Sequence, residues 1–144
     1  MTLPGLYILD GRTPTPCYDL DAWAEWMESP ARTIALDCIL CAPEPDAPVV
    51  VARISTVFLG LDLSFGHGEP LLFETIIFGT DWNLDTHRYT TWEQATAGHA
   101  AITERVIQHI LGKAQPFVCP VCQRTSFHPP DAQHRYCGAC HTFH

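Results

Sequence analysis

Two Cys-x-x-Cys pairs near the C-terminus carry the clearest chemistry in this sequence. Cys119 and Cys122 form the first pair, Cys137 and Cys140 form the second, and fourteen residues separate the two pairs. Each pair can present two thiolates from one tight turn, and Zn²⁺ prefers four such soft ligands at the corners of a tetrahedron. The spacing therefore predicts that these four cysteines bind one zinc ion.

Histidines near these cysteines are alternative ligands. His141 follows Cys140 directly and could replace it in a Cys₃His site, while His128, His134 and His144 lie close by in the sequence. Four thiolates are the simpler ligand set, and they leave no coordination position open for water or substrate. We therefore expect one structural zinc ion, which holds together a segment too short to build its own core.

The elements that must position these ligands form the last part of the chain. Two cysteine turns need a hairpin to bring them together, and the fourteen intervening residues suffice for one. Residues 113–144 are therefore expected to form a zinc ribbon. Residues 1–112 are expected to form an α+β domain with an antiparallel sheet of three to four strands, a short N-terminal helix and one long helix. A hydrophobic content of 47% is enough for a genuine core in that domain.

Charge is divided unevenly between these two parts. Residues 1–112 contain five arginines and fifteen acidic residues, whereas residues 113–144 contain three basic residues and one acidic residue. An acidic body repels phosphate and disfavours non-specific binding to nucleic acid. Any nucleic-acid contact is expected from residues 113–144, which offer cations and aromatic rings for stacking: Lys113, Arg124, Arg135, Phe127, Tyr136 and Phe143.

The sequence also indicates the cellular compartment in which the protein is expected. It has no run of eighteen apolar residues and no basic N-terminal segment followed by an apolar one, so we expect neither a transmembrane helix nor a signal peptide. Seven cysteines is an odd number, and four of them have metal spacing. This usage favours a reducing cytoplasm over a disulfide scaffold.

The N-terminal part of the chain predicts a strand and a short helix. The apolar run at residues 6–9 could form an edge strand, with a turn at Gly11. Either Asp19 or Asp21 can cap the helix that follows. Its apolar face is expected to contain Leu20, Trp23, Ala24 and Met27, with Trp26 off that stripe.

Three segments predict an antiparallel meander: residues 32–41, 49–61 and 71–78, to which the N-terminal run could add a strand. Period-two alternation in the first segment places four side chains on one face, namely Ile34, Leu36, Cys38 and Leu40. Residues 80–90 are expected to form a polar loop.

A long helix is predicted from Thr91 to about Leu111. Thr91 and Gln94 have the spacing of a capping box. The apolar stripe, which should cover one face of the sheet, consists of Trp92, Ala95, His99, Ile102, Val106 and Ile110. His99 and His109 are expected to be packing or surface residues.

Three stretches together resemble a family of small proteins common in bacteriophages and prophages, especially those of actinobacteria. They are Thr56-Val-Phe-Leu-Gly-Leu-Asp62, Pro70-Leu-Leu-Phe-Glu-Thr75 with Phe78-Gly79, and Tyr89-Thr-Thr-Trp-Glu93 with Gly98-His99. Tyr7-Ile-Leu-Asp-Gly11 is also similar, so the resemblance covers residues 6–110. It implies a phage origin and no particular activity. Cys38-Ile-Leu-Cys41 and the loop after it depart from the family's pattern.

Cys38 and Cys41 could begin a second metal site with Cys17 and His67. In a strand, however, residues three apart point to opposite faces, so we expect core cysteines instead.

His67 could act as a general acid or base with Glu69 or Glu74, but a histidine between two glycines is more typical of a turn. Glu74 is expected to face solvent or to pair with Arg53. The sequence contains no nucleophile elbow, P-loop, His-Glu-x-x-His or dinucleotide fingerprint. We therefore predict no catalytic residue and no cofactor other than zinc.

Taken together, these features and the resemblance favour a non-catalytic phage accessory protein that binds a host or phage macromolecule, with a host or phage protein as the expected partner, for example to inhibit a host defence or nucleic-acid enzyme. The alternative is a nucleic-acid-binding module that acts through residues 113–144.

Overall fold

The computed structural model describes residues 5–41, 49–79, 82, 84–113, 117–126 and 135–144. The chain divides into two compact units, Met1–Cys41 with Val49–Thr103 and Ala42–Pro48 with Glu104–His144. The division falls inside the long helix α2 (Trp92–Lys113), whereas the sequence suggested a change of domain after Gly112.

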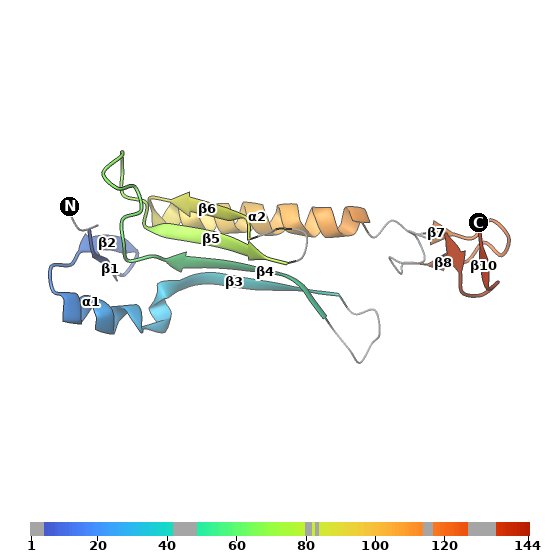
Figure 1. The fold of residues 1–144 in the computed structure, drawn as a ribbon, viewed down its shortest axis with the longest axis horizontal. Coiled ribbons are helices and arrows are strands. Elements are labelled where there is room, and N and C mark those ends of the chain that lie inside the picture. The colour runs from blue at the N-terminus through green and yellow to red at the C-terminus, as the bar shows by residue number, and fades with distance from the viewer. Residues whose placement is uncertain (1–4, 42–48, 80–81, 83, 114–116, 127–134) are drawn as a thin grey trace. The chain divides into compact units, whose positions relative to one another are not determined.

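A four-stranded antiparallel sheet dominates the first unit, in the order β3-β4-β5-β6 (Figure 1). The strands are β3 (Thr33–Cys41), β4 (Val49–Phe58), β5 (Phe73–Phe78) and β6 (Thr86–Tyr89). This sheet and the two α-helices confirm the predicted α+β class. The fourth strand, however, comes from the stretch predicted as a polar loop. Strand β6 pairs with β5 through four residue pairs, and backbone pairing of this kind does not require apolar side chains.

The N-terminal run does not join that sheet. It forms a separate hairpin of β1 (Tyr7–Asp10) and β2 (Thr13–Pro16). The N–H of Cys17 donates to the carbonyl of Leu6 at 2.8 Å, which makes these two residues a hydrogen-bonded pair. Because such pairs alternate along the ladder, Pro14 and Pro16 occupy the positions whose N–H groups would point away from β1. Proline has no N–H, so β2 cannot extend the sheet further.

Helix α1 (Leu20–Met27) is capped by Asp19, one of the two aspartates that the sequence offered. The Asp19 carboxylate accepts hydrogen bonds from the N–H groups of Asp21 at 2.9 Å and Ala22 at 3.1 Å. The predicted apolar face was wrong in part, because Leu20 is 63% exposed. Trp26 instead packs edge-on against Phe58, with ring centroids 5.4 Å apart. Contacts with the sheet, rather than the helix's own periodicity, decide which side of this two-turn helix is covered.

The core of the first unit is largely aromatic. Phe58 and Phe73 are fully buried and lie 5.3 Å apart between centroids, and Trp92 contacts Phe73 edge-on at 6.5 Å. Leu9, Leu72 and Ala95 complete the buried cluster. A short 3₁₀ helix, η1 (Pro30–Arg32), leads into β3. The hairpin, the sheet and α2 therefore share one core.

The two faces of the sheet differ. On β4 and β5 every second side chain is buried on the side of α2, including Ile54, Thr56 and Thr75. Asp37 pairs with Ile54 in the ladder, so the odd-numbered residues of β3 from Ala35 onward share this side. The apolar set that includes Ile34 and Leu36 therefore does not lie on a single covered face. Its members Leu36, Cys38 and Leu40 are all exposed.

Helix α2 begins as its sequence predicts, with one change. The Thr91 hydroxyl accepts a hydrogen bond from the N–H of Gln94 at 3.1 Å. The Gln94 amide oxygen in turn accepts hydrogen bonds from the N–H of Thr90 at 3.1 Å and from the Thr90 hydroxyl at 2.8 Å. The reciprocal half of the capping box is therefore formed one residue earlier than expected.

Candidate metal centre

Two small hairpins present the four cysteines of the second unit. Strands β7 (Phe117–Val118) and β8 (Thr125–Ser126) enclose the first cysteine pair, and β9 (Tyr136–Cys137) pairs with β10 (Thr142–Phe143) around the second. Each hairpin therefore carries one cysteine pair: Cys119, Cys122 and Cys140 lie in the turns, and Cys137 is the last residue of β9. The hairpin predicted between the pairs falls mainly on residues 127–134, which lie outside the described residues.

The two cysteine turns share one backbone feature, a residue of positive φ directly after the second cysteine. Gln123, directly after Cys122, has φ of 60°, and His141, directly after Cys140, has φ of 54°. Non-glycine residues rarely adopt this left-handed conformation. In the first turn the N–H of Gln123 donates to the carbonyl of Cys119 at 3.0 Å. A left-handed residue at this point reverses the chain after each cysteine pair.

The four sulfur atoms come together. The Sγ atoms of Cys119, Cys122, Cys137 and Cys140 all lie within 4.8 Å of one another. The Sγ atoms of Cys122 and Cys137 are 3.6 Å apart, and the described cysteines are free rather than disulfide-bonded. A tetrahedron with metal–sulfur bonds of about 2.3 Å has edges of roughly 3.8 Å. The cluster therefore has the size and donor chemistry of a four-thiolate metal site.

The electrostatics of the cluster also fit a cation. The backbone N–H of Cys122 lowers the pKa of Cys119 to about 6, against the opposing effect of burial. Contacts with the sulfurs of Cys122 and Cys137, together with burial, raise the pKa of Cys140 to about 12. Neighbouring thiolates repel one another, so without a cation they cannot all ionise at neutral pH. A bound dication stabilises all four thiolates and releases their protons.

The histidines near the cluster have other contacts. The Nδ1 atom of His141 lies 3.2 Å from the Tyr136 hydroxyl, which holds this ring. The Nε2 atom of His144 lies 3.4 Å from the Cys119 sulfur. At this distance the imidazole can hydrogen-bond to a sulfur that itself binds the metal. His128 and His134 lie outside the described residues.

The other sequence candidates do not assemble. Among the described residues, the group of His, Cys, Asp and Glu side chains whose ligand atoms converge is that of the four C-terminal cysteines. Cys38 is exposed on β3, and Cys17 follows β2. The side chain of Cys41 is not described.

His67 is exposed in a tight turn, where its N–H donates to the carbonyl of Ser64 at 3.0 Å. Glu74 forms an ion pair with Arg88 at 2.9 Å and not with Arg53. The Arg53 guanidinium lies over the Phe78 ring, 4.6 Å from its centroid. Among the described residues, no hydrogen bond or ion pair links the His67 ring to a base or a nucleophile.

Sequence reasoning missed a buried polar network beneath the sheet. The Nε2 atom of His99 lies 2.9 Å from the Asp37 carboxylate, and its Nδ1 atom lies 2.7 Å from the Thr56 hydroxyl. The Thr56 hydroxyl is 2.5 Å from that of Thr75. Since a carboxylate only accepts, Nε2 donates to Asp37; in a neutral ring, Nδ1 then accepts from the Thr56 hydroxyl.

This Asp-His-Thr order resembles a hydrolytic triad in connectivity only. Thr56 and Thr75 are fully enclosed, so no substrate can reach either hydroxyl. The arrangement instead satisfies polar groups that the packing of α2 on the sheet has removed from water. One feature of the sequence pointed to this network: the apolar stripe of α2 contains a histidine, and threonines occupy inward positions of the strands that the helix covers.

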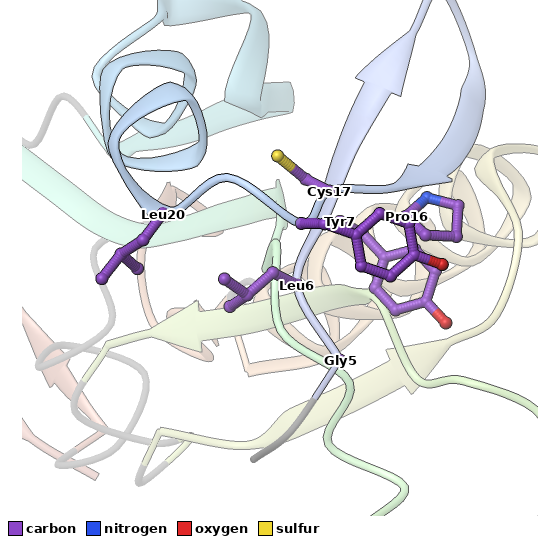
Figure 2. A pocket seen from close by; sticks show the side chains of 7 residues that line it. Gly5, Leu6, Tyr7, Pro16, Cys17 and Leu20 are labelled. Atoms are coloured by element: carbon purple, nitrogen blue, oxygen red, sulfur yellow. The ribbon is translucent and has the colours of Figure 1, made fainter.

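An apolar recess lies beside the N-terminal hairpin (Figure 2). It has a volume of about 490 Å³ and is lined by Gly5, Leu6, Tyr7, Pro16, Cys17, Tyr18 and Leu20. Tyr18 is 95% exposed at its margin. Residues 5–28 contain five carboxylates and one arginine, so the surroundings of the recess are acidic.

No family model, curated protein or solved structure matches this chain significantly. No helix in the described ranges is long and apolar enough to cross a membrane. The function of the protein therefore has to be inferred from its own geometry.

Proposed function

We propose that this protein is a non-catalytic binding protein, a phage-encoded accessory factor whose C-terminal residues form a structural zinc site. The observation that carries this proposal is the closed cluster of four cysteine sulfurs. Four protein ligands complete a tetrahedron and leave no position for substrate, which is the arrangement of structural sites. Phage origin rests on the sequence resemblance alone.

The choice of zinc follows from the ligands. Four thiolates in a tetrahedral arrangement favour zinc or an iron–sulfur centre, and they disfavour magnesium and calcium, which prefer oxygen. Cys119 and Cys122 belong to one small hairpin and Cys137 and Cys140 to another. A metal ion between them would supply the cross-link that such short strands need.

A basic host or phage protein is the partner that fits the first unit best. Tyr18 and Leu20 expose apolar surface beside the recess, and the adjacent carboxylates include Asp19 and Asp21. An apolar side chain flanked by lysine or arginine would gain from both features, because complementary charge speeds encounter and contact with the recess buries apolar area. Inhibition of a host defence or nucleic-acid enzyme is one concrete form of this binding.

The test has two parts. Purified protein should contain one zinc ion per chain, and iron or no metal would refute the metal assignment. The zinc-loaded chain is then used to retain partners from lysate of an actinobacterial host, with and without nuclease. A protein that survives nuclease, is lost with Leu20→Lys and is kept with Leu84→Lys supports docking at the recess. Leu84 is a matched control because it is 60% exposed on another segment.

Nucleic-acid binding by the second unit is the alternative. Arg124 and Arg135 are exposed there, as is the Phe143 ring. Phe143 also packs against Tyr136, with centroids 4.9 Å apart, so these two rings offer one stacking surface rather than two. Retention that disappears with nuclease and weakens steeply with added salt would favour this alternative over the protein partner.

A further inference from the structure

Strand β3 is an edge of the main sheet. It pairs with β4 on one side, and no other described strand pairs with its second side (Figure 1). Its nine residues exceed the usual strand length of about five or six. Natural edge strands are commonly protected by lysine, proline, shortness, a bulge or an inward-pointing charge. Strand β3 has a bulge of its own only at its start and one inward-pointing charge, Asp37. Thr33–Cys41 contains no lysine and no proline, and its single charge is Asp37.

The ladder between β3 and β4 defines a regular stretch within this edge. Thr33 pairs with Val57 and Ala35 with Thr56, so Ile34 is an extra residue on β3. The second irregularity, between Ile39 and Leu40, places the extra residue on β4. Strand β3 therefore runs without a bulge from residue 35 to residue 41. These seven residues are centred on Cys38.

The outward face of this stretch is an apolar stripe. Leu36 is 54% exposed, Leu40 is 58% exposed, and the exposed Cys38 lies between them. Val50 pairs with Leu40 in the ladder and is also exposed, so it widens the stripe. Exposed apolar side chains along an unpaired edge are typical of a strand that pairs with another chain.

The distribution of charge indicates what kind of chain can pair with β3. The protein has a net charge of −8, so most of its surface repels a second copy. Strands β3 and β4 together carry one acidic and one basic residue, Asp37 and Arg53. The Asp37 carboxylate is turned to the opposite face and bound by His99 at 2.9 Å. Two copies can therefore approach along this edge without the repulsion that they meet elsewhere.

We propose that β3 pairs antiparallel with β3 of a second copy, about a two-fold axis that passes through Cys38. This register places Leu36 opposite the partner's Leu40, and Cys38 opposite the partner's Cys38. Apolar cross-strand pairs of this kind stabilise a sheet. A register centred on Asp37 would instead place like charges opposite each other. The result is a continuous eight-stranded sheet with an isologous interface.

The length of the paired stretch gives the expected size of the interface. Seven residues span about 23 Å at roughly 3.3 Å per residue, and the pairing adds about six to eight backbone hydrogen bonds. Such an interface is small, so we expect a dimer in the micromolar range that exchanges with monomer. This association is independent of the proposed partner, and it would present two recesses to that partner at once.

Sedimentation equilibrium of the zinc-loaded full chain tests the proposal. We expect a concentration-dependent monomer–dimer equilibrium that Leu36→Lys and Leu40→Lys each weaken by about tenfold or more. Leu20→Lys is the matched control, because Leu20 is as exposed as these residues and lies on α1. It should leave dimerisation unchanged, although it is expected to weaken partner binding. Circular dichroism confirms that each variant is folded.

A second readout needs no change at the interface. Across paired strands, opposite Cβ atoms lie about 4.5–5.5 Å apart, and the closest pairs come within the reach of a disulfide at about 4.5 Å. Brief treatment with diamide, which accepts two electrons and two protons from the two thiols, should link Cys38 to the partner's Cys38. Mass spectrometry of the linked peptide identifies the pair, and Cys38→Ser removes it.

Three results would overturn the proposal. The wild-type chain could remain monomeric at all concentrations studied. Dimerisation could survive Leu36→Lys and Leu40→Lys. The linked peptide could join residues other than Cys38, which would place a second copy on another surface.

Discussion

Replacing His99 with alanine is expected to lower the free energy of unfolding of the first unit by about 2–4 kcal/mol. The side chain is almost fully buried, and its ring bonds both Thr56 and Asp37, at 2.7 Å and 2.9 Å. Each lost hydrogen bond costs roughly 0.5–1.5 kcal/mol, and the space left by the ring adds a cavity term.

Two milder variants test the structure of the network. Thr75→Val keeps the side-chain shape and removes one hydrogen bond, while Thr56 keeps its bond to His99, so we expect a loss of about 1 kcal/mol. Asp37→Asn should cost less than about 1 kcal/mol, because the Asp37 side chain is 54% exposed and solvent weakens the pairing. The expected order of destabilisation is therefore His99, Thr75, Asp37.

Urea unfolding followed by tryptophan fluorescence measures these losses, since all four tryptophans belong to the first unit. Zinc is kept saturating so that the second unit does not change. Thr96→Ala is the control, because Thr96 is exposed on the same helix and bonds only the carbonyl of Glu93. A cost for His99→Ala below about 1 kcal/mol, or equal to that of Thr96→Ala, would refute a stabilising network. The double variant of His99 and Thr75 should cost less than the sum of the two.

Three further predictions follow from other parts of the molecule. Chelation of zinc, or Cys119→Ser, should unfold the region from residue 117 onward, while the tryptophan fluorescence of the first unit stays native. Unfolding of the two units together would refute their independence. Burial opposes ionisation of Asp62, but contacts from Ser64 and from the N–H of Leu71 outweigh it and lower the pKa of Asp62. The stability that ionised Asp62 adds to the folded state is complete above the unfolded pKa of about 4, and it is lost as the pH falls through the folded pKa. The midpoint of urea unfolding should therefore decline less steeply towards low pH in Asp62→Asn than in the wild type. Gly98→Ala should lower the melting temperature despite its better helix propensity, because a Cβ there would overlap the Tyr89 ring. Gly112 has open space around it, so Gly112→Ala should raise the melting temperature or leave it unchanged. A higher melting temperature for Gly98→Ala would contradict this packing.

Sequence alone predicted the features that are encoded locally. The N-cap at Asp19 depends on a side chain and on N–H groups two and three residues away. The start of α2 depends in the same way on Thr91 and Gln94. The spacing of the four C-terminal cysteines also required only short turns to be recognised, and the structure gathers their sulfurs within 4.8 Å. Patterns of this kind can be predicted because their partners are neighbours in the chain.

Pairing between distant segments was harder to predict. Residues 86–89 are polar and were expected to form a loop, yet they complete the sheet because the backbone of β5 offers a free edge. The apolar run at residues 6–9 was a candidate for that sheet, and it forms its own hairpin with β2 instead. Backbone hydrogen bonding decides both outcomes, and side-chain hydropathy does not report it.

Tertiary structure alone decided which side chains became buried. Period-two alternation grouped Leu36 with Cys38 and Leu40, but the ladder with β4 turned that face outward. The same ladder turned Asp37 towards His99, sixty-two residues away in the chain. The sequence of β3 defines two faces without specifying which one is covered, because the covering helix comes from a distant segment of the chain and the register with β4 decides which face meets it.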